Sequence, residues 1–445
     1  MNNIVCKFGG SSLADSKQIL KVFDILKNDD RKIVVLSAPG KINDRDTKVT
    51  DLLFKLYNAF IKKQNYENII KEIKNRFIEI INGLNIEFDI DTEFDKICEN
   101  IKSNIDRDYI TSRGEYLISK IISKALSANF IDAKDLIFFI DKETVDFDKS
   151  YKKIRDEIKK IKNNKKIIIP GFYGAGQNGN IITFSRGGSD ITGSIIAAAI
   201  NSTIYENWTD VSGVLWTDPH LVKNPKTIEY ITYAELRELS YMGATVLHED
   251  AFYPVSKIGI PINVLNTNKK NDKGTMIVKN EFNEKHKFVV TGVAGKKNFS
   301  SVIVEKTLMN NQVGFLSKLL NIFYKYNISV EHCPTGIDTA SIIVKSEFLK
   351  EYRSEIIADI TKQLEPNNLF IEDNLSLIAV VGRNIKFSNE LLKSIFDVLS
   401  DNNITVKMID QGSSRISIII GVDDSDFEKS IKVLYNKLVD LEIRS

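Results

Sequence analysis

A lysine, two glycines and two serines stand directly behind a short apolar stretch in "IVCKFGGSSLADS" (Ile4–Ser16). Ile4, Val5 and Cys6 predict the start of a buried strand, and "DSKQILKVFDILKN" predicts a helix because its apolar residues recur at helical spacing. The glycines then lie on a strand-to-helix turn, where backbone N–H groups and a helix N-terminus face one point. Such a turn suits a phosphate, with Lys7 exposed on it, although Gly-Gly also serves plain tight turns.

Three further stretches mix glycine with hydroxyl and charged residues: "LSAPGK" (Leu36–Lys41), "TFSRGGSDITGS" (Thr183–Ser194) and "NWTDVSGVLWTDPHLV" (Asn207–Val222). In the second stretch, Arg186 offers a planar fork that matches a carboxylate or phosphate, and Asp190 would orient a lysine or a metal. Each residue alone has a simpler interpretation, since arginine forms surface salt bridges and aspartate caps helices or forms turns. Together they favour an anionic substrate.

Glu115 lies near the start of the helix that "SRGEYLISKII" predicts. A carboxylate in the first turn of a helix complements the helix dipole, which explains this residue without any function. The functional alternative is that the carboxylate binds a substrate ammonium group.

Five apolar, β-branched runs predict strands in the first two thirds of the chain, and helical patterns separate them. The runs are "RKIVVLSAPG", "DLIFFI", "KKIIIPGFYG", "STIYENWTDV" and "IPINVLNT". Continuous apolar strands that alternate with helices imply a mostly parallel sheet covered on both faces. Functional loops then gather at the carboxyl ends of the strands. Residues 52–107 are charged and helical in pattern, which predicts a helical excursion from this sheet.

The last third of the chain contains a repeat. "NISVEHC" begins at Asn327 and "NITVKMI" at Asn403, 76 residues later, and the same offset maps "SIIV" (from Ser341) onto "SIII" (from Ser417). Each copy predicts strand, helix, strand, strand, helix. Such paired α+β units are often ligand-binding or dimerising modules, an inference that rests on analogy between folds.

The charged stretch "KNEFNEKHK" marks a domain boundary near residue 285. We therefore predict an α/β domain over residues 1–285 and two smaller α+β domains over residues 286–372 and 373–445. A strand near residues 288–295 is expected to complete the second α+β domain.

Composition limits the possible functions. The 445 residues, 43% of them hydrophobic, suffice for two or three domains with their own cores. With 61 basic and 59 acidic residues the net charge is +2, which gives no electrostatic reason for binding nucleic acid or a membrane. The cysteines are few and scattered, and no signal peptide or membrane-length apolar stretch is evident, so we expect a cytoplasmic protein without disulfides or structural zinc.

Six features, in this order, resemble the aspartokinases, members of the amino acid kinase family with tandem ACT domains: "KFGGSS", "SRGE", "FSRGGSD", "WTDVSGV", "GATVLHE" and the terminal repeat. The resemblance covers essentially the whole chain. It implies a three-layer αβα kinase domain with a mostly parallel central sheet, followed by two ferredoxin-like, ACT-like regulatory domains. The implied reaction is ATP-dependent phosphorylation of the β-carboxylate of L-aspartate, the first step of lysine, threonine and methionine biosynthesis.

The resemblance also implies roles for individual residues. Lys7 would hold the transferring phosphoryl oxygens, and Asp190 would organise the phosphoryl-transfer site. Glu115 would bind the ammonium group of aspartate, and Arg186 one of its carboxylates. Further aspartate contacts would come from Ser37, Thr50 and Ser189, and nucleotide contacts from Gly9, Gly10, Ser11, Thr209 and Asp210.

The chemistry of the implied reaction agrees with these roles. A carboxylate with a reference pKa of about 4 is already ionised at neutral pH, so the reaction needs no general base. Catalysis then requires that two anions are brought into line and that charge on the γ-phosphoryl group is neutralised by Lys7, backbone N–H groups and Mg²⁺. We predict no metal site built from protein ligands alone, since none of the four histidines is paired at metal spacing.

Three departures from the family pattern fall on the nucleotide side. His220 stands in "TDPH" where many aspartokinases have arginine, Thr245 stands in "GATVLHE" where many have lysine, and "HED" replaces the common "HP". They concern the contacts to ATP and leave the phosphate and aspartate motifs intact.

The repeat implies regulation by an amino acid, bound between ACT-like units that pair in a homodimer or homotetramer. "LMNNQVGFLSKLL" supplies backbone groups at a helix N-terminus that suit a carboxylate. Acids in "ISVEHCPTGID" would meet a cationic side chain, which favours L-lysine over threonine as the effector, although each acid alone reads equally as a solvated turn residue. By resemblance, the effector residues are Met309, Gln312, Val330, Glu331, Thr335 and Asp338.

Two alternatives stay open at the level of sequence. One is another kinase of the same fold that phosphorylates glutamate, carbamate or a nucleotide. The other is a non-catalytic amino-acid sensor, which the retention of Lys7, Arg186 and Asp190 together disfavours.

Overall fold

The structure is a computed structural model that describes residues 3–27, 30–161, 165–185, 187–243, 249–279, 290–383, 385 and 388–444. The chain forms two compact units. The first consists of Met1–Val214, Thr227–Tyr233 and Val246–Phe282, and the second of Leu215–Lys226, Ala234–Thr245 and Asn283–Ser445. None of the described helices is long and apolar enough to cross a membrane.

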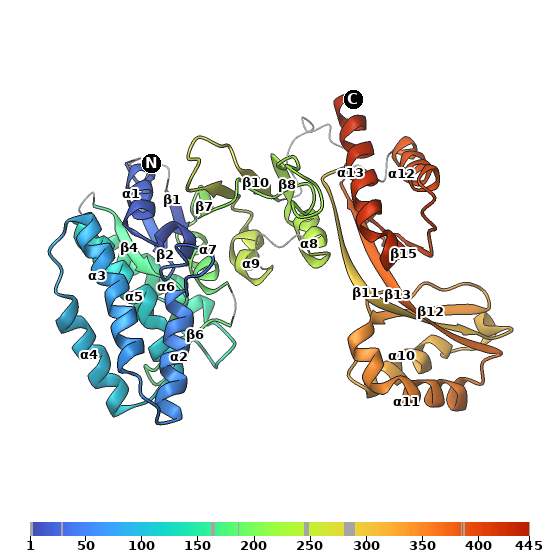
Figure 1. The fold of residues 1–445 in the computed structure, drawn as a ribbon, viewed down its shortest axis with the longest axis horizontal. Helices are drawn as coiled ribbons and strands as arrows, with labels where there is room; N and C mark the ends of the chain where they lie inside the picture. Colours follow the sequence, from blue (N-terminus) through green and yellow to red (C-terminus); the bar gives the residue numbers. More distant parts are fainter. Residues whose placement is uncertain are drawn as a thin grey trace. The chain divides into compact units, whose positions relative to one another are not determined.

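An eight-stranded sheet forms the centre of the first unit (Figure 1). Every neighbouring pair is parallel except β9 with β10, so the prediction of a mostly parallel sheet is confirmed. The strand order is β3 (Asn129–Phe130), β4 (Ile167–Pro170), β2 (Arg31–Leu36), β1 (Ile4–Phe8), β7 (Ile204–Thr209), β9 (Ile262–Asn266), β10 (Thr275–Val278) and β8 (Tyr230–Thr232).

Helices cover both faces of this sheet. Alternate residues of the central strands point to opposite faces, so each strand contacts the helices on both sides. Cys6 and Phe8 of β1 pack into a core with residues of α1 (Ser16–Ile25) and α5 (Arg107–Ala125). The opposite face carries α7 (Gly188–Ala199), flanked by α6 (Phe147–Lys160) and α9 (Glu249–Ile258). Lys7, which lies between Cys6 and Phe8, therefore belongs to the α7 side.

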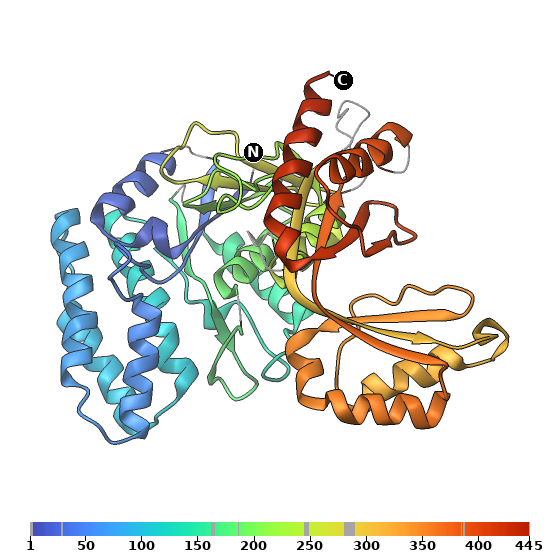
Figure 2. The same ribbon diagram turned by 45° about the vertical axis from the view of Figure 1, so that its right-hand side comes forward.

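The predicted helical excursion is present. It consists of α2 (Val49–Ile61), α3 (Glu67–Leu84) and α4 (Ile90–Ser103), which stand beside α5 in both ribbon views, as Figure 2 shows. The strand predicted at "DLIFFI" is wrong: Phe138 and Phe139 form only isolated bridges, beside the hairpin of β5 (Tyr173–Ala175) and β6 (Ile181–Thr183). Leu136, Ile137 and Phe139 are buried in the core, which explains their apolar pattern without a strand.

An antiparallel five-stranded sheet forms the centre of the second unit. Its two long central strands run through both halves of this unit (Figure 1). Helices α10 and α11 lie at one end of these strands, and α12 and α13 at the other. The strand order is β12 (Thr339–Lys345), β11 (Gly292–Glu305), β13 (Asn368–Val381), β15 (Ser417–Asp423) and β14 (Met408–Asp410). The helices are α8 (Tyr233–Tyr241), α10 (Phe315–Lys325), α11 (Ser346–Leu364), α12 (Asn389–Asp401) and α13 (Phe427–Arg444).

The sequence repeat corresponds to equivalent strands, since "SIIV" lies in β12 and "SIII" in β15. The strand predicted at "NISVEHC" is wrong in the first copy, where His332 and Thr335 form only isolated bridges to β12. Pro334 directly follows this segment, and proline has no N–H group with which to extend a ladder. The boundary predicted near residue 285 lies outside the described residues.

Candidate active site

A cleft of about 2000 Å³ opens in the first unit where β1, β2, β4 and β7 end. Backbone hydrogen bonds hold these strand ends together. The Gly9 N–H donates to the carbonyl of Trp208 (2.9 Å), the Ser37 N–H to that of Phe8 (3.1 Å), and the Gly171 N–H to that of Leu36 (2.8 Å). Loops that are far apart in the sequence therefore share one edge of the sheet, as expected for ligand sites in parallel sheets.

Two loops meet at Gly10 and Gly40. The Gly40 N–H donates to the Gly10 carbonyl at 2.8 Å, and a Cβ atom on Gly40 would lie only 2.6 Å from the Gly10 carbonyl carbon. The chain passes from β1 through Gly9 into a 3₁₀ helix (Gly10–Leu13) and then into α1, so the predicted strand-to-helix turn is present. Glycine is needed here because the two backbones touch.

Lys7 is not an exposed turn residue, and that expectation is wrong. It lies inside β1 and is 7% exposed, with its Nζ atom 2.6 Å from Asp190 Oδ1. Asn207 completes the group, since its Nδ2 donates to the same Asp190 oxygen at 2.9 Å and its Oδ1 lies 3.5 Å from Lys7 Nζ. Parallel pairing of β1 with β7 sets Lys7 directly opposite Asn207.

The first turn of α7 faces the same cleft. Gly187 caps this helix with φ of 57°, in the left-handed region that favours glycine, and the Asp190 side chain is bound to Lys7 and Asn207 instead of capping the helix. Ser189 is buried, and a Cβ atom on Gly171 would lie 2.6 Å from its Oγ. The backbone N–H groups of this helix start favour an anion. Arg186 lies outside the described residues.

Glu115 is a buried carboxylate in the middle of α5. The helix begins at Arg107 and has Asp108 in its first turn, so complementing the helix dipole does not explain Glu115. It is 4% exposed, and burial raises its pKa to about 8, opposed by the N–H groups of Ala38 and of Glu115 itself. Within the described part of the chain, its Oε2 atom has no hydrogen-bond partner. A buried acceptor without a partner is costly, so this oxygen is poised to receive a donor from a ligand.

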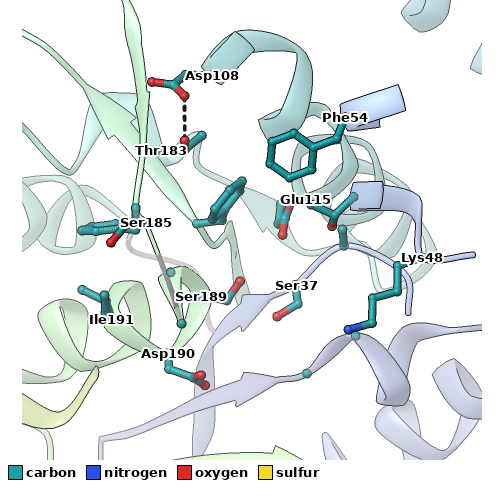
Figure 3. Close-up of a pocket in the computed structure, with 18 of the residues that line it drawn as sticks. Ser37, Lys48, Phe54, Asp108, Glu115, Thr183, Ser185, Ser189, Asp190 and Ile191 are labelled. Atoms are coloured by element: carbon teal, nitrogen blue, oxygen red, sulfur yellow. Dashed lines mark hydrogen bonds between the residues drawn. The ribbon is translucent and has the colours of Figure 1, made fainter. Parts of the chain in front are cut away.

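The cleft brings together the catalytic, aspartate-binding and nucleotide-binding residues predicted from the sequence, as far as the structure describes them. In Figure 3, Ser37, Glu115 and Ser189 face a common space, with Asp190 beside it. The predicted residues that line the cleft are Lys7, Gly9, Gly10, Ser11, Ser37, Thr50, Glu115, Ser189, Asp190, Thr209 and Asp210.

The structure describes only some of the residues at which this sequence departs from the family pattern. Thr245 and His248 lie outside the described residues. His220 belongs to the second unit, where its N–H donates to Asp218 Oδ1 at 2.8 Å, so Asp218 acts as a turn former.

Four functional candidates were missed by the sequence analysis. Asn207 binds both Lys7 and Asp190, and Thr183 donates to Asp108 Oδ1 at 2.8 Å across the cleft wall (Figure 3). Lys48 also lines the cleft. The only signal for Asn207 was its place in a glycine-rich stretch, because strand pairing over 200 residues cannot be read from sequence.

The predicted effector residues lie in the first half of the second unit. Met309 is buried in its core, Val330 packs against that core, and Gln312 and Thr335 are exposed. The carboxylate of Glu331 accepts a hydrogen bond from the Tyr241 hydroxyl of α8. Asp338 accepts the Leu308 N–H at 2.8 Å, which is the contact of an ordinary turn acid.

Among the described residues, no group of three or more His, Cys, Asp or Glu side chains could hold a metal ion. Mg²⁺ in phosphoryl-transfer sites commonly uses one or two carboxylates together with substrate phosphates and water. The carboxylate of Asp190 at the cleft fits that pattern.

Comparison with known proteins assigns the family. The model of the amino acid kinase family matches residues 2–266, and an ACT domain model matches residues 378–438. Aspartokinase 3 of Bacillus subtilis is 35% identical, and the match covers 97% of this chain and 98% of that protein. The crystal structure of Clostridium acetobutylicum aspartate kinase is 46% identical, with a TM-score of 0.89, and the match covers 98% and 100% of the two chains.

Escherichia coli aspartokinase III shares the fold at lower identity. Its complex with aspartate and ADP is 23% identical, with a TM-score of 0.73 and a match over 98% and 99% of the two chains. A second crystal structure of that enzyme contains lysine and aspartate. On its sequence and its fold, this chain is a kinase that belongs to the aspartokinases of the amino acid kinase family.

Proposed function

We propose that this enzyme transfers the γ-phosphoryl group of ATP to the β-carboxylate of L-aspartate and forms 4-phospho-L-aspartate. One observation carries the proposal: the same cleft contains the Lys7–Asp190 pair, to which Asn207 is bound, and a buried carboxylate, Glu115, whose Oε2 has no partner among the described residues. The first suits a phosphoryl group and the second an ammonium group. A substrate that uses both sites is an amino acid with a second carboxylate, because its ammonium group binds at one site and its side-chain carboxylate receives the phosphoryl group at the other.

The charges of the side chains in the cleft determine which group of the substrate each residue binds. Glu115 binds the α-ammonium group, while Ser37, Thr50 and Ser189 donate hydroxyl hydrogen bonds to the carboxylates. We assign Arg186 to one of those carboxylates, from its position in "FSRGGSD". Since the acceptor carboxylate is already ionised at neutral pH, the enzyme has only to position it and to stabilise the charge that develops during transfer.

Stabilisation of that charge falls to the turn after β1 and the start of α7. Lys7 Nζ and the backbone N–H groups that follow Gly9 face the phosphates, since the Gly9 N–H itself donates to the Trp208 carbonyl. Asp190 with Asn207 fixes the direction of the lysine. We assign Ser11, Thr209 and Asp210 to the nucleotide side. Mg²⁺ would add positive charge beside the phosphates of ATP, and Asp190 is the carboxylate that would hold it.

The experiment that tests this function is a coupled assay of ADP release. We expect ADP release with ATP and L-aspartate, and little with L-glutamate or carbamate. Release with another acceptor, at a rate equal to that with aspartate, would reassign the substrate within the fold. No release with any acceptor would favour the non-catalytic sensor.

We also propose that the second unit binds an end-product amino acid, L-lysine, and that its first half pairs with a second copy of the chain. Glu331 supports the choice of lysine, because its carboxylate suits a side-chain ammonium group and threonine has none. Pairing is supported by an apolar stripe on α10, where Leu316, Leu320 and Tyr324 recur at helical spacing and remain exposed. Three unpaired thiols fit a reducing compartment such as the cytoplasm.

A further inference from the structure

The helical excursion from the sheet reaches the cleft through an arginine. Arg76 lies on α3, and its side chain is only 11% exposed, although arginine is mostly a surface residue. Its Nη2 donates to the Gly40 carbonyl at 3.0 Å, and the same atom forms an ion pair with Asp46. Both partners belong to the segment between β2 and α2, part of which lines the cleft.

We call residues 40–48 the cleft loop. The carboxylate of Asp46 closes this loop, since its Oδ2 accepts the Ile42 N–H at 2.7 Å and its Oδ1 accepts the Thr47 N–H at 2.9 Å. The Asp46 N–H also donates to the Asn43 carbonyl at 3.1 Å. These hydrogen bonds are local, so they set the shape of the loop and not its position against the strand ends.

The position of the cleft loop depends on Gly40, which is bound on both sides. Its carbonyl accepts the hydrogen bond from Arg76, and its N–H donates to the Gly10 carbonyl at 2.8 Å. A charged donor forms a stronger hydrogen bond than a neutral one. Arg76 is therefore connected through one residue to the glycine turn after β1.

Lys48 stands at the other end of the cleft loop. It precedes α2, and its side chain extends into the cleft (Figure 3). The next N–H group, that of Val49, donates to the Pro39 carbonyl at 3.1 Å, so the two ends of the loop are joined. A shift of the loop would therefore move the contact at Gly10 and the ammonium group of Lys48 together.

We propose that Arg76 is a positioning residue for the nucleotide: with Asp46 it holds the cleft loop against Gly10, so that the glycine turn keeps the shape that receives the phosphates of ATP. This role rests on the proposed function, because it assumes that the turn binds those phosphates. Arg76 is not among the described residues that line the cleft, so it acts through the loop.

The test compares Arg76→Met, which removes the charge, with Arg76→Lys, which keeps the charge but lacks the planar fork of arginine. Lys74→Met is the matched control, because Lys74 lies on the same helix and forms its ion pair with Asp91 of α4 instead of the cleft loop. The KM values for ATP and for aspartate are measured for each variant.

Limited trypsin digestion provides a second measurement that does not depend on activity. The cleft loop contains three exposed sites for this protease, Lys41, Arg45 and Lys48. Mass spectrometry of the first fragments gives the rate of cleavage within the loop, and thermal unfolding of the same samples shows whether the whole fold is weakened.

We expect Arg76→Met to raise the KM for ATP about tenfold, the scale of one lost hydrogen bond to a charged group. The KM for aspartate should change less, because Glu115 and Ser189 lie on other elements. Cleavage within the loop should become about tenfold faster, since proteolysis follows the population of the open form. Arg76→Lys should fall between Arg76→Met and wild type, and Lys74→Met should resemble wild type.

Cleavage of the loop at the wild-type rate in Arg76→Met, or an unchanged KM for ATP, would overturn the proposal. Equal changes in Lys74→Met would overturn it as well, because they would show a general weakening of α3. If Arg76→Met does not fold, Asp46→Asn is measured in its place with the same expectations. Failure of the proposed function is seen separately, as the absence of aspartate-dependent ADP release in wild type, while the digestion still tests the contact of Arg76 with the loop.

Discussion

The ammonium group of Lys7 and the carboxylate of Asp190 are 2.6 Å apart, and they join the first strand of the chain to the first turn of α7. Asn207 binds both residues from the neighbouring strand. A lysine held in this way has a fixed direction before the nucleotide arrives. Such preorganised charge stabilises a transition state without reorganisation at the moment of reaction.

Lys7→Ala should lower kcat about a hundredfold or more, because it removes the cation that faces the developing phosphoryl charge. Steady-state kinetics with aspartate and ATP measure this effect. A variant with near-normal kcat would contradict the assignment of Lys7.

A fold control is needed, because Lys7→Ala leaves the Asp190 carboxylate without its ion pair. The double variant Lys7→Met with Asp190→Asn removes both charges and should unfold at a temperature close to that of wild type. Its activity should stay as low as that of the single variant. If the double variant regained activity, the pair would be structural only.

Glu115→Gln should weaken the use of aspartate strongly and affect the KM for ATP much less, because it removes the partner of the α-ammonium group. The two KM values, measured on one preparation, test this. An equal loss for both substrates would indicate that Glu115 acts only in the structure of the cleft.

The same substitution should stabilise the fold at alkaline pH. The pKa of Glu115 in the folded state is about 8, above its ordinary value, so the folded state holds a proton that the unfolded state releases. The free energy of unfolding of wild type therefore falls as pH rises from about 4.5 to about 8, and Glu115→Gln lacks this loss. We expect a gain of at least about 1 kcal/mol at pH 8, since one pKa unit corresponds to about 1.4 kcal/mol. Denaturant unfolding at pH 5 and pH 8 measures it, and an equal difference at both pH values would contradict the assignment.

Much of this site was predictable from sequence because it depends on local patterns. The glycine turn after β1 and the start of α7 follow from residue types at short spacing, and the parallel sheet brings their loops to one edge. The errors concern burial and pairing. Lys7 was expected on an exposed turn, but β1 continues to Phe8 and pairs in register with β7, which turns the lysine toward Asp190.

Other features depend on contacts over long separations. The sequence analysis placed Glu115 in the first turn of its helix, because the helical pattern does not show that α5 already starts at Arg107. The apolar run that contains Phe138 and Phe139 predicted a strand. It is buried in the core but forms only isolated bridges and no strand ladder. The guanidinium carbon of Arg113 lies 5.4 Å from the ring centre of Tyr173, sixty residues further along the chain, so no spacing rule predicts this contact.

L-Lysine should inhibit the enzyme and L-threonine should not, since only lysine presents a side-chain cation to Glu331. Inhibition requires that lysine binds a low-activity state more tightly than the active state. Inhibition curves for wild type and Glu331→Ala check this, with the variant expected to lose sensitivity about tenfold or more. Unchanged sensitivity in Glu331→Ala, or no lysine inhibition of wild type, would remove Glu331 from the effector site.

Tyr241 should compete with the effector, because its hydroxyl donates to the Glu331 carboxylate that lysine would use. Tyr241→Phe frees this carboxylate and should lower the lysine concentration for half inhibition about threefold, the scale of one modest hydrogen bond. Tyr326→Phe, which removes a hydroxyl that donates to the Asp359 carboxylate at 2.9 Å, is the matched control and should leave the curve unchanged. A weaker response to lysine in Tyr241→Phe would show that this hydroxyl helps to build the site.

The most direct test of the account is to identify the product and count it against ADP. Hydroxylamine traps an acyl phosphate as a hydroxamate, so it separates transfer to aspartate from simple hydrolysis of ATP. With wild-type enzyme we predict one aspartyl hydroxamate for each ADP released, and with Lys7→Ala neither product above background. ADP without hydroxamate, or hydroxamate formed equally well by Lys7→Ala, would contradict the claim that this cleft transfers a phosphoryl group to aspartate.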